Sequence, residues 1–386
     1  MPKPSSSFDV AVIGAGAIGL AVAWRAAQRG LRVVVLERAD PGGGTSHVAA
    51  GMLAPVSEAR AVEREVLKLG LVSAELYPSF IEELRAASGA DPGYLPCGTL
   101  AVARDRDEAE ELERELELRR SLGLSVRRLR PSEARTLVPA LAPTVRLALL
   151  AETDHALDPR RLTAALLKAA QAAGVHVRSP ATAAALQTGS DGAVAGVRLK
   201  DGEAIDAPQV VVAAGSWSPT IGGIPDGLKV PVHPVKGQIM RLHDPAGPGL
   251  VTTVLRMPGG YLVPRGDGRY VLGATMEERG FETTVTAGAV YALLRDASEL
   301  VPSISELVID ELSAGLRPAT PDNAPALGPS PLVGLHWAVG HYRHGILLTP
   351  VTAEIVAGAL GGERAPEYAL AFAPDRFARA AVAVEA

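Results

Sequence analysis

Three glycines near the start of the chain have the spacing of a dinucleotide-binding turn. Gly14, Gly16 and Gly19 form a Gly-x-Gly-x-x-Gly motif directly after the run 8–13, in which five residues are apolar. The first glycine permits a tight turn, the second lets a pyrophosphate approach the backbone, and the third lets a helix pack closely on the strand. The helix that follows would offer free N–H groups and a partial positive charge to phosphates.

An acidic residue stands where such a motif requires one. Glu37 lies 23 residues after Gly14, at the end of a second apolar run, 31–36. A carboxylate at this position can bind both ribose hydroxyls of an adenosine, and it would repel a 2′-phosphate. Together with the helix-forming stretch 20–29, these features predict a strand–turn–helix–strand unit that binds a dinucleotide.

A second candidate for chemistry is an arginine between a strand and a proline-led loop. Arg317 follows Gly315 and Leu316 and precedes Pro318. Held rigidly there, its planar guanidinium would suit a carboxylate, which it can bind with two parallel hydrogen bonds. The pattern alone leaves a surface arginine as the alternative.

A third candidate is the segment 336–350, in which a strand ends at Gly340 and turns through Gly345 into a helix. The N-terminus of that helix, directed at a cofactor ring, would stabilise negative charge on it. His341 and His344 resemble a pair of metal ligands, but no third ligand is in sight. No metal site is therefore predicted.

The bulk composition excludes several classes of protein. The net charge is −5 over 386 residues, which argues against a nucleic-acid partner. Cys97 is the single cysteine, so a disulfide framework and a cysteine zinc site are excluded, and we interpret it as a packed apolar residue. No apolar run is long enough for a membrane span and the leader 1–7 is polar, so we expect a soluble cytoplasmic protein.

The elements around these candidates predict an α/β protein. An N-cap and helix at 158–173 precede a short strand, and the apolar run 210–214 reads as a buried parallel strand that ends at a glycine. From 229 to 276 short alternating runs and turns predict a mostly antiparallel sheet. The stretch 39–55 predicts a loop, 57–90 a helix and 94–103 a strand. The highly charged stretch 105–122 is interpreted as a solvated surface helix.

The first part of the chain resembles the FAD-dependent D-amino-acid oxidase family, and within it the glycine oxidases of bacterial thiamine biosynthesis. The motifs that carry the resemblance lie in the glycine turn, the second strand and the loop after it, at 14–19, 36–38, 43–46 and 49–53. The likeness extends over nearly the whole chain. It implies FAD rather than NAD, bound without a covalent link, because Cys97 does not match the place where related enzymes attach their flavin.

The resemblance, added to the residue patterns, gives a set of expected cofactor-binding residues. Thr45 and Ser46 would offer hydroxyls to a phosphate, Ala181 would touch the adenine end through its backbone, and the segment around His341 would lie against the isoalloxazine. The full set is Gly14, Ala15, Gly16, Ala17, Ile18, Gly19, Glu37, Arg38, Thr45, Ser46, Ala50, Gly51, Met52, Ala181, Gly215, Trp217, His341, Tyr342, Arg343, His344, Gly345, Ile346 and Leu347.

The resemblance also implies a mechanism. Arg317 would bind the carboxylate of glycine and Tyr261 would donate a phenol hydrogen bond to it, so that a hydride passes from Cα to flavin N5. Arg343, Met52 and Met276 would complete the substrate site. The products would be glyoxylate, ammonia and H₂O₂, with O₂ as the second substrate.

Several points stay open at this level. Some relatives have a histidine where this chain has Gly259, so a polar contact or gate of those enzymes is missing here. The alternatives are an oxidase of sarcosine or a small D-amino acid, a dehydrogenase with an acceptor other than O₂, and a flavin-binding or RNA-modifying relative without this activity. The relatives imply a homotetramer or homodimer.

The expected domain organisation is discontinuous. A Rossmann-like FAD-binding domain would comprise 1–85, 145–225 and 310–386. A substrate-binding domain built on the mostly antiparallel sheet would comprise 86–144 and 226–309.

Overall fold

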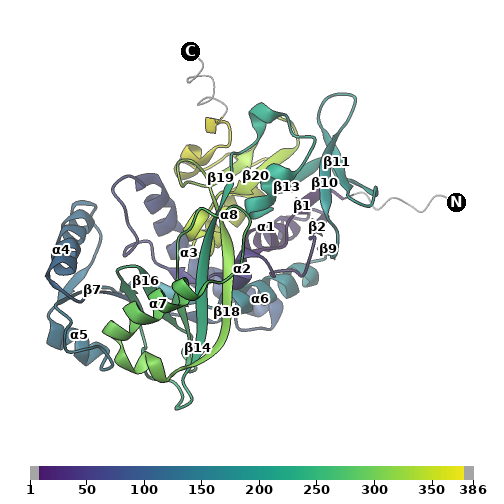
Figure 1. Ribbon diagram of the computed structural model, residues 1–386. Helices are drawn as coiled ribbons and strands as arrows, with labels where there is room; N and C mark the ends of the chain where they lie inside the picture. Colours follow the sequence, from purple (N-terminus) through teal and green to yellow (C-terminus); the bar gives the residue numbers. More distant parts are fainter. Residues whose placement is uncertain (1–7, 378–386) are drawn as a thin grey trace.

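A six-stranded sheet carries the predicted glycine turn in the computed structural model, which describes residues 8–377 (Figure 1). Strand β1 is central and pairs in parallel with β2 on one side and β13 on the other. The strands follow the order β19 (Ala326–Pro329), β20 (Leu335–Val339), β13 (Gln209–Val212), β1 (Val10–Ile13), β2 (Val33–Leu36) and β9 (His176–Arg178). Every residue of β1 and β2 is buried, because both faces of this sheet are covered.

The two faces of this sheet have different covers. Val10 and Val12 point to a core shared with helices, whereas Ala11 and Ile13 pack against a small antiparallel sheet. The helices are α1 (Ala17–Gln28), α3 (Arg64–Ser88), α6 (Pro159–Ala172) and α8 (Thr349–Leu360). The small sheet consists of β10 (Ala183–Thr188), β11 (Val194–Leu199) and β12 (Ala204–Asp206). Because side chains alternate along β1, this strand contributes to the hydrophobic cores on both faces of the sheet.

An eight-stranded, mostly antiparallel sheet forms the other half of the molecule, as the sequence predicted. Its order is β18 (Val308–Ala319), β14 (His233–His243), β17 (Arg269–Gly273), β16 (Gly260–Pro264), β15 (Val254–Met257), β5 (Thr99–Ala103), β7 (Leu147–Ala151) and β6 (Arg127–Leu129). Only β15 and β5 pair in parallel within it, among the described residues. The helices near it are α4 (Arg106–Ser121), α5 (Pro131–Leu137) and α7 (Ala287–Leu300) (Figure 1).

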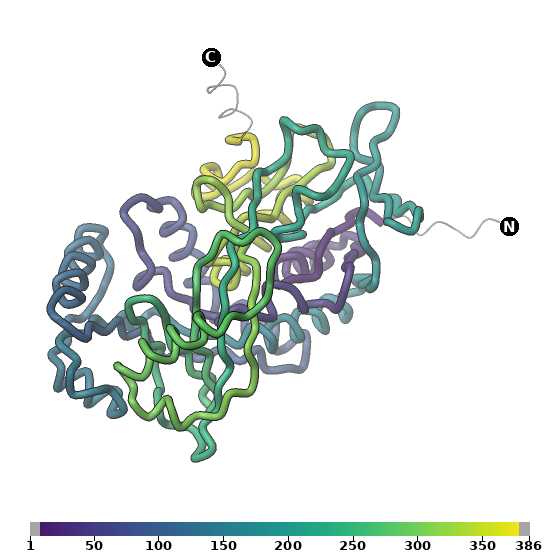
Figure 2. Tube along the Cα trace, in the orientation of Figure 1, coloured from purple at the N-terminus to yellow at the C-terminus, as the bar shows by residue number. Residues whose placement is uncertain are grey.

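The chain passes between the two halves several times. In Figure 2 the purple and yellow ends of the trace lie together in one half, and blue and green segments form the other. The eight-stranded sheet includes β7 and β18, which the sequence analysis had put largely with the FAD-binding segments. The division of the chain into two domains stays a prediction.

Local differences from the expected elements concern the segments 39–63 and 94–103. The expected loop after β2 contains a short helix, α2 (Thr45–Val48), and a short strand, β3 (Met52–Leu53). The helix expected from residue 57 begins only at Arg64. The strand expected over 94–103 is split into β4 (Tyr94–Leu95) and β5, and β3, β8 (His155–Leu157) and β4 form a separate sheet.

Five short 3₁₀ helices complete the described elements. They are η1 (Gly215–Thr220), η2 (Asp226–Leu228), η3 (Pro302–Glu306), η4 (Tyr342–His344) and η5 (Glu367–Phe372). Within residues 8–377, no helix is both long and apolar enough to cross a membrane.

The predicted N-cap of α6 is confirmed. The Asp158 side chain accepts hydrogen bonds from the backbone N–H groups of Arg160 and Arg161, and Pro159 occupies the first helical position. This arrangement satisfies two N–H groups that an α-helix leaves free at its start, and the proline loses no hydrogen bond there.

Substitution of Gly19 should disrupt the turn between β1 and α1. A Cβ built on Gly19 would lie 2.0 Å from the carbonyl oxygen of Gly14, which is backbone and cannot move aside cheaply. We expect Gly19→Ala to lower Tm in a thermal melt followed by circular dichroism. Gly288→Ala is the matched control, because a Cβ there meets nothing within 4 Å inside helix α7, and we expect a slightly higher Tm. Equal effects of the two changes would contradict the close packing.

Candidate active site

A cavity of about 700 Å³ lies where the two halves meet. Its wall combines the glycine turn and the 42–52 segment with β14, β16 and β18 from the eight-stranded sheet. All the predicted site residues line it except Ala15, Gly19, His344 and Leu347. A volume of this size is typical of sites for cofactors and small ligands.

The four exceptions lie behind the cavity wall. Ala15 is fully buried and its N–H donates to the Glu37 carboxylate at 2.8 Å. Gly19 provides the close packing described above. His344 faces the carboxylate of Glu58, with 3.6 Å between Nδ1 and Oε2, and Leu347 is a core residue. These residues lie behind the wall and do not form its surface. Contact of these four residues with the cofactor stays a prediction.

The glycine turn leaves room for a ligand at one end of the cavity. Gly14 has a φ of +108°, and a Cβ there would lie 2.5 Å from the carbonyl oxygen of Ala213. Gly16 is the N-cap of α1 and makes no side-chain cap hydrogen bond. Backbone N–H groups at a helix start, without a Cβ in front of them, fit a pyrophosphate. The residues present therefore fit the dinucleotide that the sequence predicts.

A carboxylate and a cation–aromatic pair lie near this turn. Both Glu37 carboxylate oxygens accept backbone hydrogen bonds, from Ala15 at 2.8 Å and Ala39 at 3.1 Å, which fixes the orientation of the side chain. The guanidinium carbon of Arg38 lies 3.6 Å from the centre of the Trp217 ring. All three side chains belong to the cavity wall and could hold the adenosine portion of a dinucleotide.

Two of the expected cofactor groups have other partners in this structure. The Thr45 hydroxyl donates to the carbonyl oxygen of Leu316 at 2.7 Å and is not free to donate to a phosphate. The Ala181 N–H donates to the backbone oxygen of Glu37 at 2.6 Å, which leaves its carbonyl as the available group. The Ser46 hydroxyl accepts from Ala17 N–H at 3.1 Å and retains its own hydrogen for donation.

Arg317 presents a cation at the opposite side of the cavity. Its Nη1 donates to the carbonyl oxygens of Thr275 at 3.0 Å and Lys236 at 3.4 Å. Among the ion pairs of residues 8–377, none involves Arg317. A guanidinium held by neutral carbonyls, with no acid paired to it, is suited to bind an anionic group of a ligand.

Gly237 creates the space for this guanidinium. It pairs with Gly315 in the register of β14 with β18, and a Cβ on it would lie 2.4 Å from Arg317 Nη1 and 2.6 Å from its Cζ. Only a residue without a side chain leaves the arginine in this position. The sequence analysis missed this requirement because it depends on two strands that lie about 80 residues apart.

Tyr261 lies in β16 and lines the same part of the cavity. Burial raises the pKa of its phenol above the usual range, while the nearby Arg317 acts in the opposite direction. The hydroxyl is therefore protonated at neutral pH and can donate a hydrogen bond to a bound anion.

Two methionines line the cavity. Met52 is half-buried in β3, and Met276 is 59% exposed. The Tyr342 hydroxyl lies 3.1 Å from the sulfur of Met276 and connects that residue to the 341–346 segment. Both methionines stay proposals as substrate contacts.

Arg343 lines the cavity but its charge is already paired. Its Nη1 lies 3.3 Å from Oε1 of Glu63, its Nη2 also contacts that carboxylate, and its Nε lies 4.0 Å from Glu58. Glu63 is buried and Glu58 itself lines the cavity. Sequence reasoning missed both acids because the segment that holds them was expected to be helical; the only available signal was the helix-breaking Pro55.

The two histidines of the 341–346 region are neutral. Burial lowers the pKa of His341 to about 3, and burial followed by the Arg343 charge lowers the pKa of His344 to about 3. His341 Nε2 forms a 2.9 Å hydrogen bond with Thr352 of helix α8. Positive charge here therefore comes from arginines and helix ends. Across the described part of the chain, no cluster of three or more acidic, His or Cys residues could hold a metal ion.

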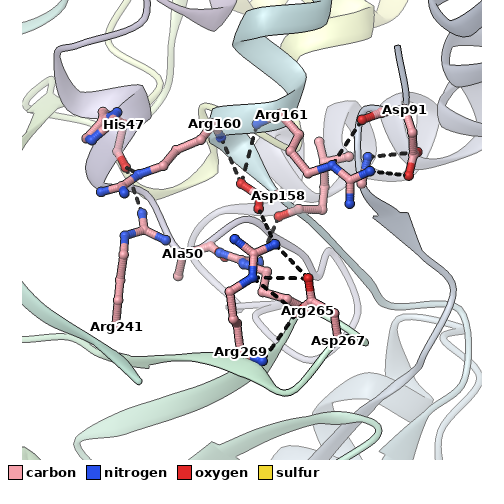
Figure 3. A network of polar contacts seen from close by, with 12 residues as sticks. His47, Ala50, Asp91, Asp158, Arg160, Arg161, Arg241, Arg265, Asp267 and Arg269 are labelled. Carbon is pink, nitrogen blue, oxygen red and sulfur yellow. Dashed lines mark hydrogen bonds and ion pairs between the residues drawn. The ribbon is translucent and has the colours of Figure 1, made fainter. Parts of the chain in front are cut away.

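The guanidinium of Arg265 holds the 50–52 segment from outside (Figure 3). Its Nη2 donates to the carbonyl oxygen of Ala50 at 2.7 Å and its Nη1 to that of Leu157 at 3.0 Å. Burial lowers its pKa to about 10, so it remains charged at neutral pH. Tyr261 and Val263 share one face of β16 because side chains alternate along a strand, and Arg265 directly follows this strand.

We expect Arg265→Gln to weaken the binding of the dinucleotide, assayed with FAD, by about tenfold. It removes the charged donor from two carbonyl oxygens and releases the cavity-lining Ala50 segment, and a hydrogen bond from a charged group contributes roughly 1.5–3 kcal/mol. The Kd follows from FAD fluorescence during dilution. Arg269→Gln is the control, because Arg269 is half-exposed and pairs with Asp267 beside the same hairpin. Equal Kd values for the two variants would contradict this role of Arg265.

A family model described as FAD dependent oxidoreductase matches residues 9–359. A protein named glycine oxidase from Geobacillus kaustophilus is 36% identical over 352 residues, covering 91% of this chain and 92% of that protein. The crystal structure of glycine oxidase from Geobacillus kaustophilus superposes with a TM-score of 0.89 at 34% identity, over 95% of this chain and 98% of that one.

A longer relative matches as well. The bifunctional protein ThiO/ThiG of Synechocystis is 36% identical over 377 residues, which is 96% of this chain but 54% of that protein. The chain thus spans about half the length of this bifunctional relative. The family model covers the glycine turn, both sheets and the cavity that they enclose, and the chain belongs to the family of FAD-dependent oxidoreductases.

Proposed function

We propose that this protein oxidises glycine with FAD and O₂. The observation that carries the proposal is the Arg317 guanidinium, which lines the cavity with no acidic partner among the described residues and lies close to the protonated phenol of Tyr261. The relatives named glycine oxidase support the substrate. The cofactor is FAD, as the family shows.

The protein's own residues would bind and orient the amino acid. Arg317 would hold the carboxylate with two parallel hydrogen bonds, and Tyr261 would donate a third. Anchoring the carboxylate fixes the position of Cα, and positioning of this kind contributes most of the protein's share of the rate. Bound FAD would accept a hydride from Cα and pass the two electrons to O₂, which forms H₂O₂. The released imine then takes up water and yields glyoxylate and ammonia.

The dinucleotide would lie along the wall described above. The glycine turn and the start of α1 would bind the pyrophosphate, Glu37 the ribose, and the pair Arg38–Trp217 the adenine end. Ala50, Met52 and the 341–346 segment would flank the flavin ring. Arg343 would act on the ligand less directly than Arg317, since its charge is shared with Glu63.

The proposal extends to the setting of the enzyme. The imine would feed thiazole synthesis for thiamine, and the protein would act in the cytoplasm as a homotetramer or homodimer. Oxidation of sarcosine or a small D-amino acid, or use of an acceptor other than O₂, are the alternatives. A comparison of kcat/KM values and of the H₂O₂ yield separates them.

The direct test is to purify the protein, record its visible spectrum and add glycine without oxygen. A yellow protein that bleaches on addition of glycine supports both flavin and substrate. Bleaching with sarcosine or D-alanine but not with glycine would change the substrate and keep the family.

We expect Arg317→Ala to raise KM for glycine by about 10- to 100-fold. The change removes the charged partner of the carboxylate, and such hydrogen bonds contribute roughly 1.5–3 kcal/mol. Steady-state H₂O₂ production measures it. Arg317→Lys, which keeps the charge but loses the planar fork, should lie between the wild type and the alanine variant. An unchanged KM in Arg317→Ala would contradict the carboxylate clamp.

Gly237→Ala should impair the same step without altering Arg317 itself. The new Cβ would displace the guanidinium from its present position, so we expect KM for glycine to rise by about tenfold or more. The matched control is Gly227→Ala, where a Cβ meets nothing within 4 Å. If both variants keep the wild-type KM, the position of Arg317 in this structure is not the one that binds substrate.

A further inference from the structure

The segment 54–63 between β3 and α3 forms the substrate end of the cavity wall without being a helix or strand itself. Glu58 and Arg60 line the cavity. Glu63 forms the ion pair with Arg343. The position of these charged groups beside the proposed substrate therefore depends on what holds the segment from outside.

A buried carboxylate binds the segment from one side. Asp154, which directly precedes β8, is 0% exposed. Its Oδ1 accepts the N–H of Val56 at 3.0 Å and its Oδ2 accepts the N–H of Ser57 at 2.6 Å. Both carboxylate oxygens are thus used on adjacent peptide groups of one segment.

A buried guanidinium binds the same two residues through their carbonyls. Arg119, near the end of α4, is 2% exposed. Its Nε donates to the carbonyl oxygen of Val56 at 3.0 Å and its Nη2 donates to that of Ser57. One acid and one base from two distant elements therefore engage every backbone polar group of Val56 and Ser57.

Helix α4 is a surface helix, as the sequence predicts, and one of its residues also supports the segment 54–63. Its outer face is charged and exposed, but Arg119 points inward and is supported by Glu115, whose carboxylate lies 3.0 Å from its Nη2. Glu115 in turn accepts from Arg256 of β15 at 2.8 and 3.0 Å. This chain of charges orients Arg119 toward the segment.

We propose that Asp154 and Arg119 are positioning residues for the substrate end of the site, which hold Val56 and Ser57 so that Glu58 faces the bound amine and Glu63 stays paired with Arg343. The inference rests on the proposed function for the identity of the substrate. We call the four hydrogen bonds from Asp154 and Arg119 to Val56 and Ser57 the backbone clamp. Its effect on the segment 54–63 can be measured without enzyme turnover.

The clamp should open in acid. Burial raises the pKa of Asp154 to about 6, against the lowering effect of the Ser57 and Val56 hydrogen bonds. Once protonated, the carboxyl has one oxygen that carries a hydrogen and faces an N–H donor, so one of the two hydrogen bonds is lost. Because the pKa of Asp154 is higher in the folded than in the unfolded protein, ionisation of this carboxyl lowers the free energy of unfolding as the pH rises to about 6. The ionised carboxylate in return accepts both hydrogen bonds that hold Val56 and Ser57.

Several other charged or titratable groups lie around Asp154 and could contribute to a pH dependence of the segment. Glu58 faces it from the segment, Arg119 and Glu115 from α4, and Arg256 from β15 behind them. His155 follows in β8, and burial lowers the pKa of its imidazole. Because His155 is a titratable group adjacent to Asp154, His155→Gln is a required control.

Hydrogen exchange of the peptide covering 54–63, followed by mass spectrometry of the FAD-loaded protein, tests the clamp directly. With intrinsic rates corrected for pH, we expect protection in the wild type at pH 8 to fall about tenfold or more at pH 5. In Asp154→Asn it should be low at both pH values, because the amide also faces an N–H donor. His155→Gln and Glu152→Gln, the latter an exposed acid near the same strand, should behave like the wild type. Equal protection in Asp154→Asn and the wild type would overturn the proposal.

Kinetics separates positioning from a merely structural effect. For the wild type we expect KM for glycine to rise below pH 6. We expect Asp154→Asn to raise KM at pH 8 with a smaller change in kcat, and to abolish the rise below pH 6. Arg119→Gln should raise KM likewise, whereas Arg120→Gln, on the exposed face of α4, should not. A KM unchanged in both clamp variants, or an acid limb that persists in Asp154→Asn, would overturn the positioning role. Lack of glycine turnover in the wild type would instead count against the proposed function and leave the exchange experiment valid.

Discussion

The close approach of backbone segments at the turn between β1 and α1 is the constraint on which the rest of the structure depends. Side chains at Gly14 or Gly19 would collide with the backbone of Ala213 or of the turn itself. The contact packs α1 closely against β1 and the end of β13 and puts the start of α1 at the cavity. A dinucleotide site follows because the same missing side chains leave N–H groups open to a phosphate.

The two halves of the molecule are joined by polar contacts that also shape the site. The Leu316 carbonyl accepts hydroxyl hydrogen bonds from Thr45 and Ser216, both on the cofactor side. The next residue, Arg317, faces the substrate side of the cavity. Arg265, which directly follows β16, donates in the same way to the carbonyl oxygen of Ala50 in the 50–52 segment. A displacement of the backbone in one half would therefore also move the other half, because side chains of one half are hydrogen-bonded to backbone carbonyls of the other.

The distribution of charge in the cavity is selective. Arg343 is neutralised by Glu63 and the two histidines stay uncharged, because burial disfavours their protonated forms. Arg317 is held by carbonyl oxygens and has no acidic partner among the described residues, so an anion bound there would meet a full positive charge. This contrast supports Arg317, more than Arg343, as the residue that binds the carboxylate of a ligand.

The sequence by itself determined the β1–turn–α1–β2 unit, the acid at Glu37, the N-cap at Asp158 and the antiparallel character of the second sheet. Each depends on residues close together in the chain, whose spacing fixes the local backbone geometry. Only the tertiary structure decided that Gly237 makes room for Arg317, that Glu58 joins the cavity and that Arg119 turns inward from a charged helix. These features arise from strands and helices that meet across long stretches of chain, and no local pattern encodes which side chains then face one another.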